Sequence, residues 1–175
     1  MIDEIRSALG AYYLHIKWIH VMSAAVWSFS TAVAYVNYLK PAIVSAHRHP
    51  GDEASRKRRD EFMERFDKDA ELEHYALAIL IVTAALMLWL ARVDLTHWSY
   101  FTAKVWIGIL VIAPMEAIDI YLAHLGANKA RVKATGDMER YEQVMRWHLL
   151  FLRITEPLVI ILIPTMFFIA IVKPF

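Results

Sequence analysis

The 175-residue chain contains no cysteine. This absence excludes disulfides, thiolate metal sites, iron–sulfur clusters and haem attached through cysteine. Glycine and proline are scarce, with five and six residues, so extended irregular structure is not expected. Basic residues lie in segments that also carry acidic residues, which gives a nucleic-acid partner no support.

Apolar residues are what the chain has in excess. They make up 58% of it, and the mean hydropathy of +0.37 is too high for an ordinary soluble domain of this size. Four apolar stretches, at about 12–38, 73–92, 99–124 and 147–172, each match the hydrocarbon thickness of a bilayer. The first is too long and too polar in its first half for a signal peptide. We therefore expect an all-α fold, a four-transmembrane-helix bundle that forms one integral membrane domain over residues 1–175.

The orientation follows from the basic residues. They concentrate in two charged connections, 40–72 and 125–146, whereas the 93–98 connection has none. The excess of Lys and Arg on cytoplasmic loops predicts that both charged connections are cytoplasmic and that both termini lie on the outer side. The predicted location is a bacterial-type inner (plasma) membrane, with the chain as a multi-pass protein in contact with the lipid bilayer.

Several local signals refine the spans. Lys40-Pro41 interrupts the first apolar stretch, although a helix could continue beyond it, and Pro50-Gly51 predicts a turn. Good helix formers from Glu53 onward predict a solvent-exposed helix that leads into the second span. Pro114 should kink the third span, because it removes one backbone donor and crowds the preceding turn.

A first group of polar residues lies near the outer ends of two spans. His15 and Lys17 are expected at the bilayer interface, where their polar ends reach water. His20 and Lys104 lie deeper and at similar depth, and His20 shares a helix face with Trp27, seven residues on. His20 could be an axial ligand of haem iron or could bond a neighbouring helix. Lys104 could ligate iron when deprotonated, or pair with a haem propionate or an acidic substrate.

A second group lies at the cytoplasmic ends of the spans. His74, His124 and His148 could be interfacial residues only. Alternatively, a pair of them with Glu116 or Glu156 could hold a second haem or a metal ion.

Two pairs of charged residues lie slightly deeper on that side. Arg153 and Glu156 are three residues apart, a spacing that favours an ion pair within one helix. Glu116 and Asp119 have the same spacing on the third span. A charge-balanced cluster among these four residues could carry protons or lock the third and fourth helices together.

Two stretches resemble a known family. IKWIHVMSAAVWSFSTAVAYVNYL is similar to the first helix of the HemJ-type protoporphyrinogen oxidases, with a His followed by a Trp seven residues later. AKVWIGILVI resembles the Lys-bearing helix of that family, whose wider relatives include CopD-like four-helix membrane proteins. Ser28, Phe29 and Ser30 depart from the family, which usually has a glycine there. The resemblance implies a b-type haem in the bundle, with His20 and Lys104 as the functional His and Lys.

No nucleophile–base pattern, phosphate-binding loop or hydrolase carboxylate pair stands out, which leaves redox chemistry or transport. The leading hypothesis is a haem-b-binding membrane oxidoreductase, which transfers electrons or acts as a quinone-linked oxidase with a quinone or porphyrin as its partner. Two alternatives stay open. One is a non-enzymatic accessory subunit of a larger membrane complex or homo-oligomer, and the other is a small metal or ion transporter.

Overall fold

The computed structural model describes residues 1–173, with the backbone alone at position 31. Every regular element in these residues is helical, and no strand occurs among them. Four helical segments are long and apolar enough to span a membrane: Tyr13–Arg48, Glu53–Ala91, Tyr100–Ala123 and Met138–Val172. The prediction of an all-helical chain is confirmed, and so is the expected number of helices that are long and apolar enough to cross a membrane. The chain forms two compact units, Met1–Val93 and Asp94–Phe175, and each is described by itself.

The first unit begins with a short helix and then a long helical rod. The short helix α1 (Ile2–Gly10) has no buried residue. The rod joins α2 (Tyr13–Ala34), η1 (Tyr35–Leu39) and α3 (Lys40–Arg48). The η1 segment is π-helical, since the Lys40 N–H bonds to the carbonyl of Tyr35 five residues back. The helix therefore passes Pro41 without ending, because the wider π turn lies just before the proline, where a helical donor is missing.

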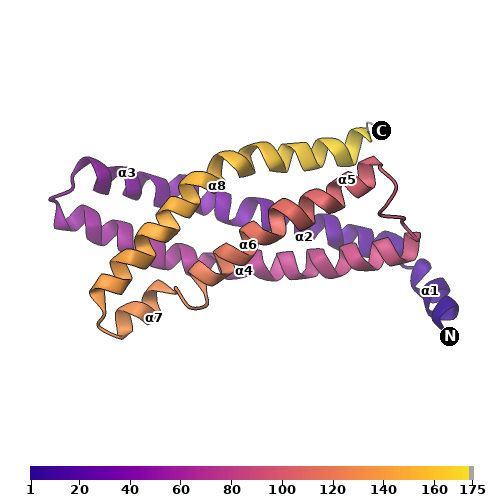
Figure 1. The fold of residues 1–175 in the computed structure, drawn as a ribbon, viewed down its shortest axis with the longest axis horizontal. Coiled ribbons are helices and arrows are strands. Elements are labelled where there is room, and N and C mark those ends of the chain that lie inside the picture. The colour runs from indigo at the N-terminus through magenta and orange to yellow at the C-terminus, as the bar shows by residue number, and fades with distance from the viewer. Residues whose placement is uncertain (174–175) are drawn as a thin grey trace. The chain divides into compact units, whose positions relative to one another are not determined.

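A tight turn reverses the chain after α3, at the predicted Pro50-Gly51. The Asp52 carboxylate then accepts hydrogen bonds from the N–H groups of Ala54 and Ser55, at 3.2 and 3.1 Å. These bonds satisfy donors that the first turn of a helix leaves open. The helix α4 (Glu53–Ala91) begins at this cap. It runs back along α2 and forms an antiparallel hairpin with it (Figure 1).

Small and aromatic side chains fill the seam of this hairpin. On the rod, Trp27, Ala34 and Ala42 are buried, and on α4 so are Met63 and Ala70. Small residues let two helices approach closely, which is how apolar helices associate without a hydrophobic difference from lipid. Met63 is fully buried against α3 and η1 in the half of α4 that the sequence predicts to be solvent-exposed. That prediction is wrong for this face, because the rod continues to Arg48 and covers it.

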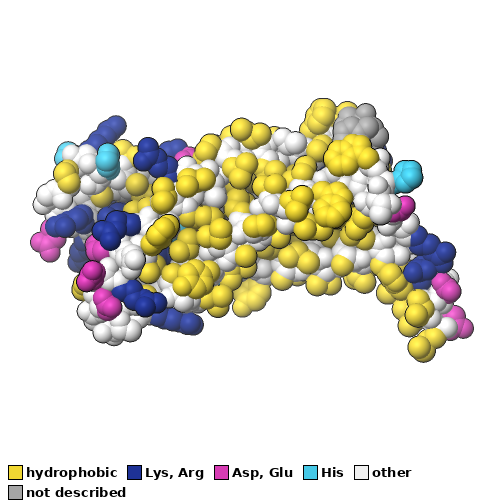
Figure 2. Space-filling view, viewed as in Figure 1, with side chains coloured by type: hydrophobic (Ala, Val, Ile, Leu, Met, Phe, Trp, Pro, Cys, Tyr) yellow, Lys and Arg dark blue, Asp and Glu magenta, His cyan; other side chains and the backbone are white. Residues whose placement is uncertain are grey.

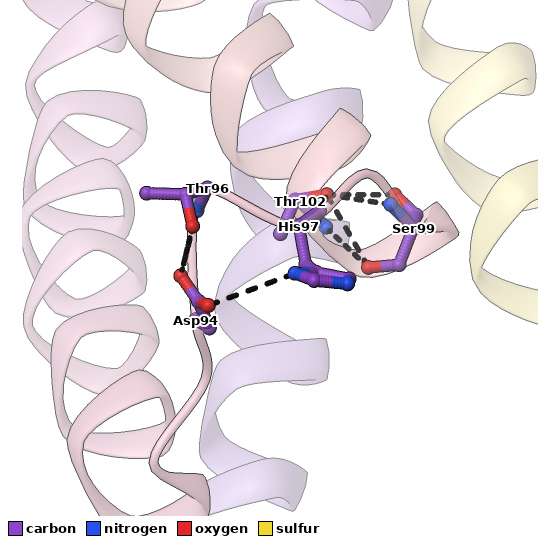
Figure 3. Close-up of polar contacts among 5 residues, drawn as sticks. All are labelled: Asp94, Thr96, His97, Ser99 and Thr102. Atoms are coloured by element: carbon purple, nitrogen blue, oxygen red, sulfur yellow. Dashed lines mark hydrogen bonds and ion pairs between the residues drawn. The ribbon is translucent and has the colours of Figure 1, made fainter.

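A short connection opens the second unit, and its polar contacts begin the next helix (Figure 3). Asp94 Oδ1 accepts hydrogen bonds from the N–H and the hydroxyl of Thr96, at 2.9 and 2.7 Å. Ser99 and Thr102 form a reciprocal capping box: the Thr102 N–H donates to Ser99 Oγ, and the Ser99 N–H donates to Thr102 Oγ1. This box satisfies two donors at the start of α5.

The second unit contains a helical rod, a short helix and one long helix. The rod joins α5 (Tyr100–Ile107), the π-helical η2 (Gly108–Ile112) and α6 (Ala113–Ala123). The π turn lies just before Pro114, where the sequence predicts a kink. In the same way, η1 lies just before Pro41 in the first unit. After α7 (Lys129–Ala134), α8 (Met138–Val172) runs back along α6 and α5 in Figure 1.

The surfaces of the long helices are apolar. Figure 2 shows hydrophobic side chains along them, and Lys and Arg side chains gathered where α3 meets α4 and around α7. Large apolar side chains of α2, α4, α6 and α8 are half or more exposed, including Trp18, Val82, Ile118, Ile154 and Ile161. A soluble protein rarely exposes so much contiguous apolar surface, whereas lipid solvates it. The exposed side chains thus agree with the length and composition of the helices as candidate membrane spans.

Candidate functional site

His20 lies in the seam of the first unit and bonds across it to α4. Its Nδ1 is 3.0 Å from Thr83 Oγ1. The Thr83 hydroxyl hydrogen points to the carbonyls of its own helix, at 2.7 Å from Ile79 O and 3.0 Å from Leu80 O. Since that hydrogen is engaged, Thr83 accepts and His20 Nδ1 donates. This tautomer leaves the ring lone pair on Nε2, which is the form of imidazole that binds metals.

Trp27 lies two helical turns from His20 on the same side of α2 and is 8% exposed. In the antiparallel hairpin it lies level with Ala76, which is seven residues before Thr83 and also buried. Among residues 1–173, Trp27 Nε1 has no hydrogen-bond acceptor. A buried N–H without an acceptor is costly in an apolar interior and marks a place where a polar group of a ligand would fit.

The other predicted residues of the outer group divide between the two units. His15 and Lys17 are exposed on α2, as an interfacial position requires. Lys104 belongs to the second unit, where it is half-buried and its Nζ lies 5.7 Å from the Tyr100 ring centre and 5.1 Å from that of Phe101. These rings stabilise an ammonium group through cation–π attraction. The pairing of His20 in the first unit with Lys104 in the second stays a prediction.

A second polar cluster lies inside the second unit. His148 and Lys129 are both fully buried, and Lys129 Nζ contacts His148 Nδ1 directly. Lys129 Nζ also donates to the carbonyl of Leu122, at 3.0 Å. On the other side of the ring, His148 Nε2 lies 3.3 Å from Asp119 Oδ1. An imidazole thus separates an ammonium from a carboxylate, and three elements, α6, α7 and α8, meet at one histidine.

The hydrogen-bond roles within this cluster follow from the charges. The ammonium of Lys129 has only donors, so His148 Nδ1 accepts from it. The ring proton then lies on Nε2, on the side of the Asp119 carboxylate. The charges of Lys129 and Asp119 balance, which is the condition under which buried ionic groups are tolerated.

The remaining predicted residues occupy several environments. His74 is half-buried on α4 in the first unit, and His124 is half-buried at the end of α6 in the second. Glu116 is buried on α6, one turn before Asp119. Arg153 is exposed on α8, whereas Glu156 is half-buried. The ion pair between these last two residues stays a prediction.

Lys129 is the residue that sequence reasoning missed. The sequence shows Lys129 only as one of several basic residues in the 125–146 connection, yet its side chain is fully buried. One signal was available: Lys129 and Val132 are three residues apart on α7, so they share a face, and Val132 is the apolar residue that docks that helix. Asn128 begins α7 by accepting the N–H of Arg131, which turns this face inward.

Metal coordination by side chains alone has little support within the described chain. Among residues 1–173, no three His, Asp or Glu side chains come together in a group that could hold a metal ion. His148 lies between a lysine and an aspartate, with Lys129 beside Nδ1 and Asp119 beside Nε2. No protein-family model matches the chain, and neither a curated protein nor a solved structure matches it.

Proposed function

We propose that the protein is a multi-pass membrane oxidoreductase that binds haem b through His20. The observation that carries the proposal is the hydrogen bond from His20 Nδ1 to Thr83, because it orients the ring and leaves the lone pair on Nε2. Haem-ligating histidines need this second bond, which fixes the ring and tunes the ligand. The resemblance of the first and third spans to haem-linked membrane oxidases supports the same assignment.

The residues near His20 fit such a group by their donor chemistry. The buried Trp27 Nε1–H, which lacks an acceptor among residues 1–173, can donate to a carboxylate of the porphyrin. A b-type haem supplies one-electron redox chemistry at its iron. With haem bound, His20 Nε2 would hold the iron, Thr83 would hold the ring proton of His20, and the apolar helices would exclude water.

The test is an absorption spectrum of the detergent-purified protein, produced with an adequate haem supply. A Soret band is expected in the wild type and should be lost in His20→Ala. His15→Ala is the matched control, because His15 lies on the same helix but is exposed, and this variant should keep the band. Thr83→Val should keep the band but weaken haem binding about tenfold or more, as loss of an outer-sphere partner does. A wild-type protein without a Soret band would contradict the proposal.

A second candidate, ion or proton movement, draws support from the Lys129–His148–Asp119 cluster. Proton relays in membranes are built from buried Asp, Glu and His residues that contact one another. In liposomes loaded with a pH-sensitive dye, His148→Phe should then abolish proton uptake that the wild type shows, whereas His97→Phe, at an exposed loop position, should not. Equal uptake by the wild type and His148→Phe would leave the cluster a structural role.

The orientation of the chain is part of the proposal. The basic residues around α7 and where α3 meets α4 support a cytoplasmic position for both connections and an outer position for both termini. Cysteines introduced at Ser7 and at Thr135 test it by labelling of intact cells with a membrane-impermeant maleimide. Labelling at position 7 only is expected, and labelling at position 135 only would reverse the orientation.

A further inference from the structure

An open groove of about 580 Å3 lies in the second unit between the end of α6 and the first half of α8. On α8 its lining follows one face at helical spacing, from Arg140 and Gln143 through Trp147 to Ile154. At 1.5 Å per residue this stripe is about 21 Å long. The opposite wall includes Ile118 of α6. The groove is therefore long, narrow and continuous along one helix face.

The chemistry of the groove changes along its length. Arg140 and Gln143 lie at one end, whereas the lining from Val144 to Ile154 is apolar or aromatic. Among residues 1–173, no carboxylate pairs with the guanidinium of Arg140. The hydrogen bond from Arg140 to Asp137, the cap of α8, is donated by the backbone N–H. Trp147 is 59% exposed, one helical turn beyond Gln143. Tryptophan prefers this position at the level of lipid headgroups.

One glycine keeps the groove in this shape. The ring of Tyr121 lies directly against Gly126, and a Cβ added at Gly126 would come within 2.8 Å of that ring. Any side chain at position 126 would therefore displace Tyr121, which lines the groove. The hydroxyl-bearing ring is half exposed, so it borders the opening.

We propose that this groove binds one anionic phospholipid, with its phosphate at Arg140 and an acyl chain along the apolar lining toward Ile154. The charge of Arg140 complements a headgroup phosphate, and the planar guanidinium suits a bidentate contact with it. Basic pockets between membrane helices bind acidic headgroups in this way. The proposal concerns the second unit only and stands independently of haem binding at His20.

The experiment uses the full chain in nanodiscs of phosphatidylcholine that contain a trace of diazirine-tailed lipid. After photolysis, mass spectrometry measures the labelling of groove residues on α8 by a phosphatidylglycerol probe and by a phosphatidylcholine probe. Preferential labelling by the phosphatidylglycerol probe, by about fivefold, is expected for one basic residue near the surface. Arg140→Gln should remove the preference, and Arg140→Lys should keep most of it.

Arg146→Gln is the matched control, because Arg146 is exposed on the same helix and does not line the groove. It should keep the preference. Gly126→Ala should reduce labelling by both probes, since it displaces Tyr121. Three results would overturn the proposal: equal labelling by both probes in the wild type, equal loss in Arg140→Gln and Arg146→Gln, or displacement of both probes by a neutral long-chain quinone.

Discussion

The side chains of Lys129 and His148 touch at full burial, Nζ against Nδ1, where α7 packs on α8. The contact fixes a helix of only six residues, Lys129–Ala134, which is too short to be stable alone. The Leu122 carbonyl, left without a helical partner near the end of α6, accepts the second bond of the same ammonium. One lysine thus joins three helices of the second unit.

Removal of this lysine should destabilise the protein strongly. Lys129→Met keeps the length of the side chain but takes a buried hydrogen-bond donor from His148 Nδ1 and from the Leu122 carbonyl. Loss of one partner from a buried ionic contact costs about 3 kcal/mol. Unfolding of the purified protein, followed by circular dichroism in detergent, measures the loss. Arg131→Met on the same helix is the control, since Arg131 is exposed, and it should change stability by about 0.5 kcal/mol or less.

The two tryptophans of α2 should differ sharply. Trp27 is 8% exposed and Trp18 is 65% exposed. Trp27→Ala leaves a cavity at a buried position of α2 and should cost about 3 kcal/mol or more. Trp18→Ala removes a side chain from the outer surface and should cost well under 1 kcal/mol. The same unfolding assay compares them, and equal losses would contradict the packing described for the hairpin.

Asp94 should titrate at an unusually low pH. The hydroxyl and the N–H of Thr96 both donate to its carboxylate, which holds the pKa of Asp94 below 3.8. A lowered pKa means that the ionised carboxylate stabilises the fold above about pH 3.8, and that this contribution disappears as the pH falls through the lower folded-state value. NMR titration of the Asp94 carboxyl carbon in detergent micelles measures the pKa.

Thr96→Val should raise that pKa toward the ordinary aspartate value, because the larger of the two stabilising bonds is lost. Thr165→Val is the control: the Thr165 hydroxyl bonds only a carbonyl of its own helix, so the titration of Asp94 should not move. A pKa of Asp94 that is unchanged in Thr96→Val would show that the loop contacts do not persist in solution.

The sequence was sufficient for the helices and insufficient for the contacts between them. Apolar length alone predicts the four spans, because only a long helix satisfies every backbone group in lipid. The Pro50-Gly51 turn is equally local. The burial of Met63 was not predictable in this way, since it depends on how far α3 continues beyond Pro41.

The same contrast between local signals and contacts between helices applies to the candidate sites. His20 was identified because a titratable residue stands out within an apolar helix, but its bond to Thr83 joins residues 63 positions apart. Lys129 was missed because a lysine in a charged connection resembles its exposed neighbours. The docking of α7 onto α8 distinguishes it, and the local signals for that docking are the apolar Val132 and the cap at Asn128.

The π turn at Gly108–Ile112 changes how positions on the third span relate to one another. A π turn adds about one residue to a helical repeat of 3.6, so side chains beyond it are rotated by roughly 100° from the positions that a regular helix would give them. Lys104 lies before this turn, and Glu116 and Asp119 lie after it. A helical wheel drawn through the whole span would therefore assign these residues to the wrong sides, and deletion of one residue within the turn would turn the acidic pair onto a different face.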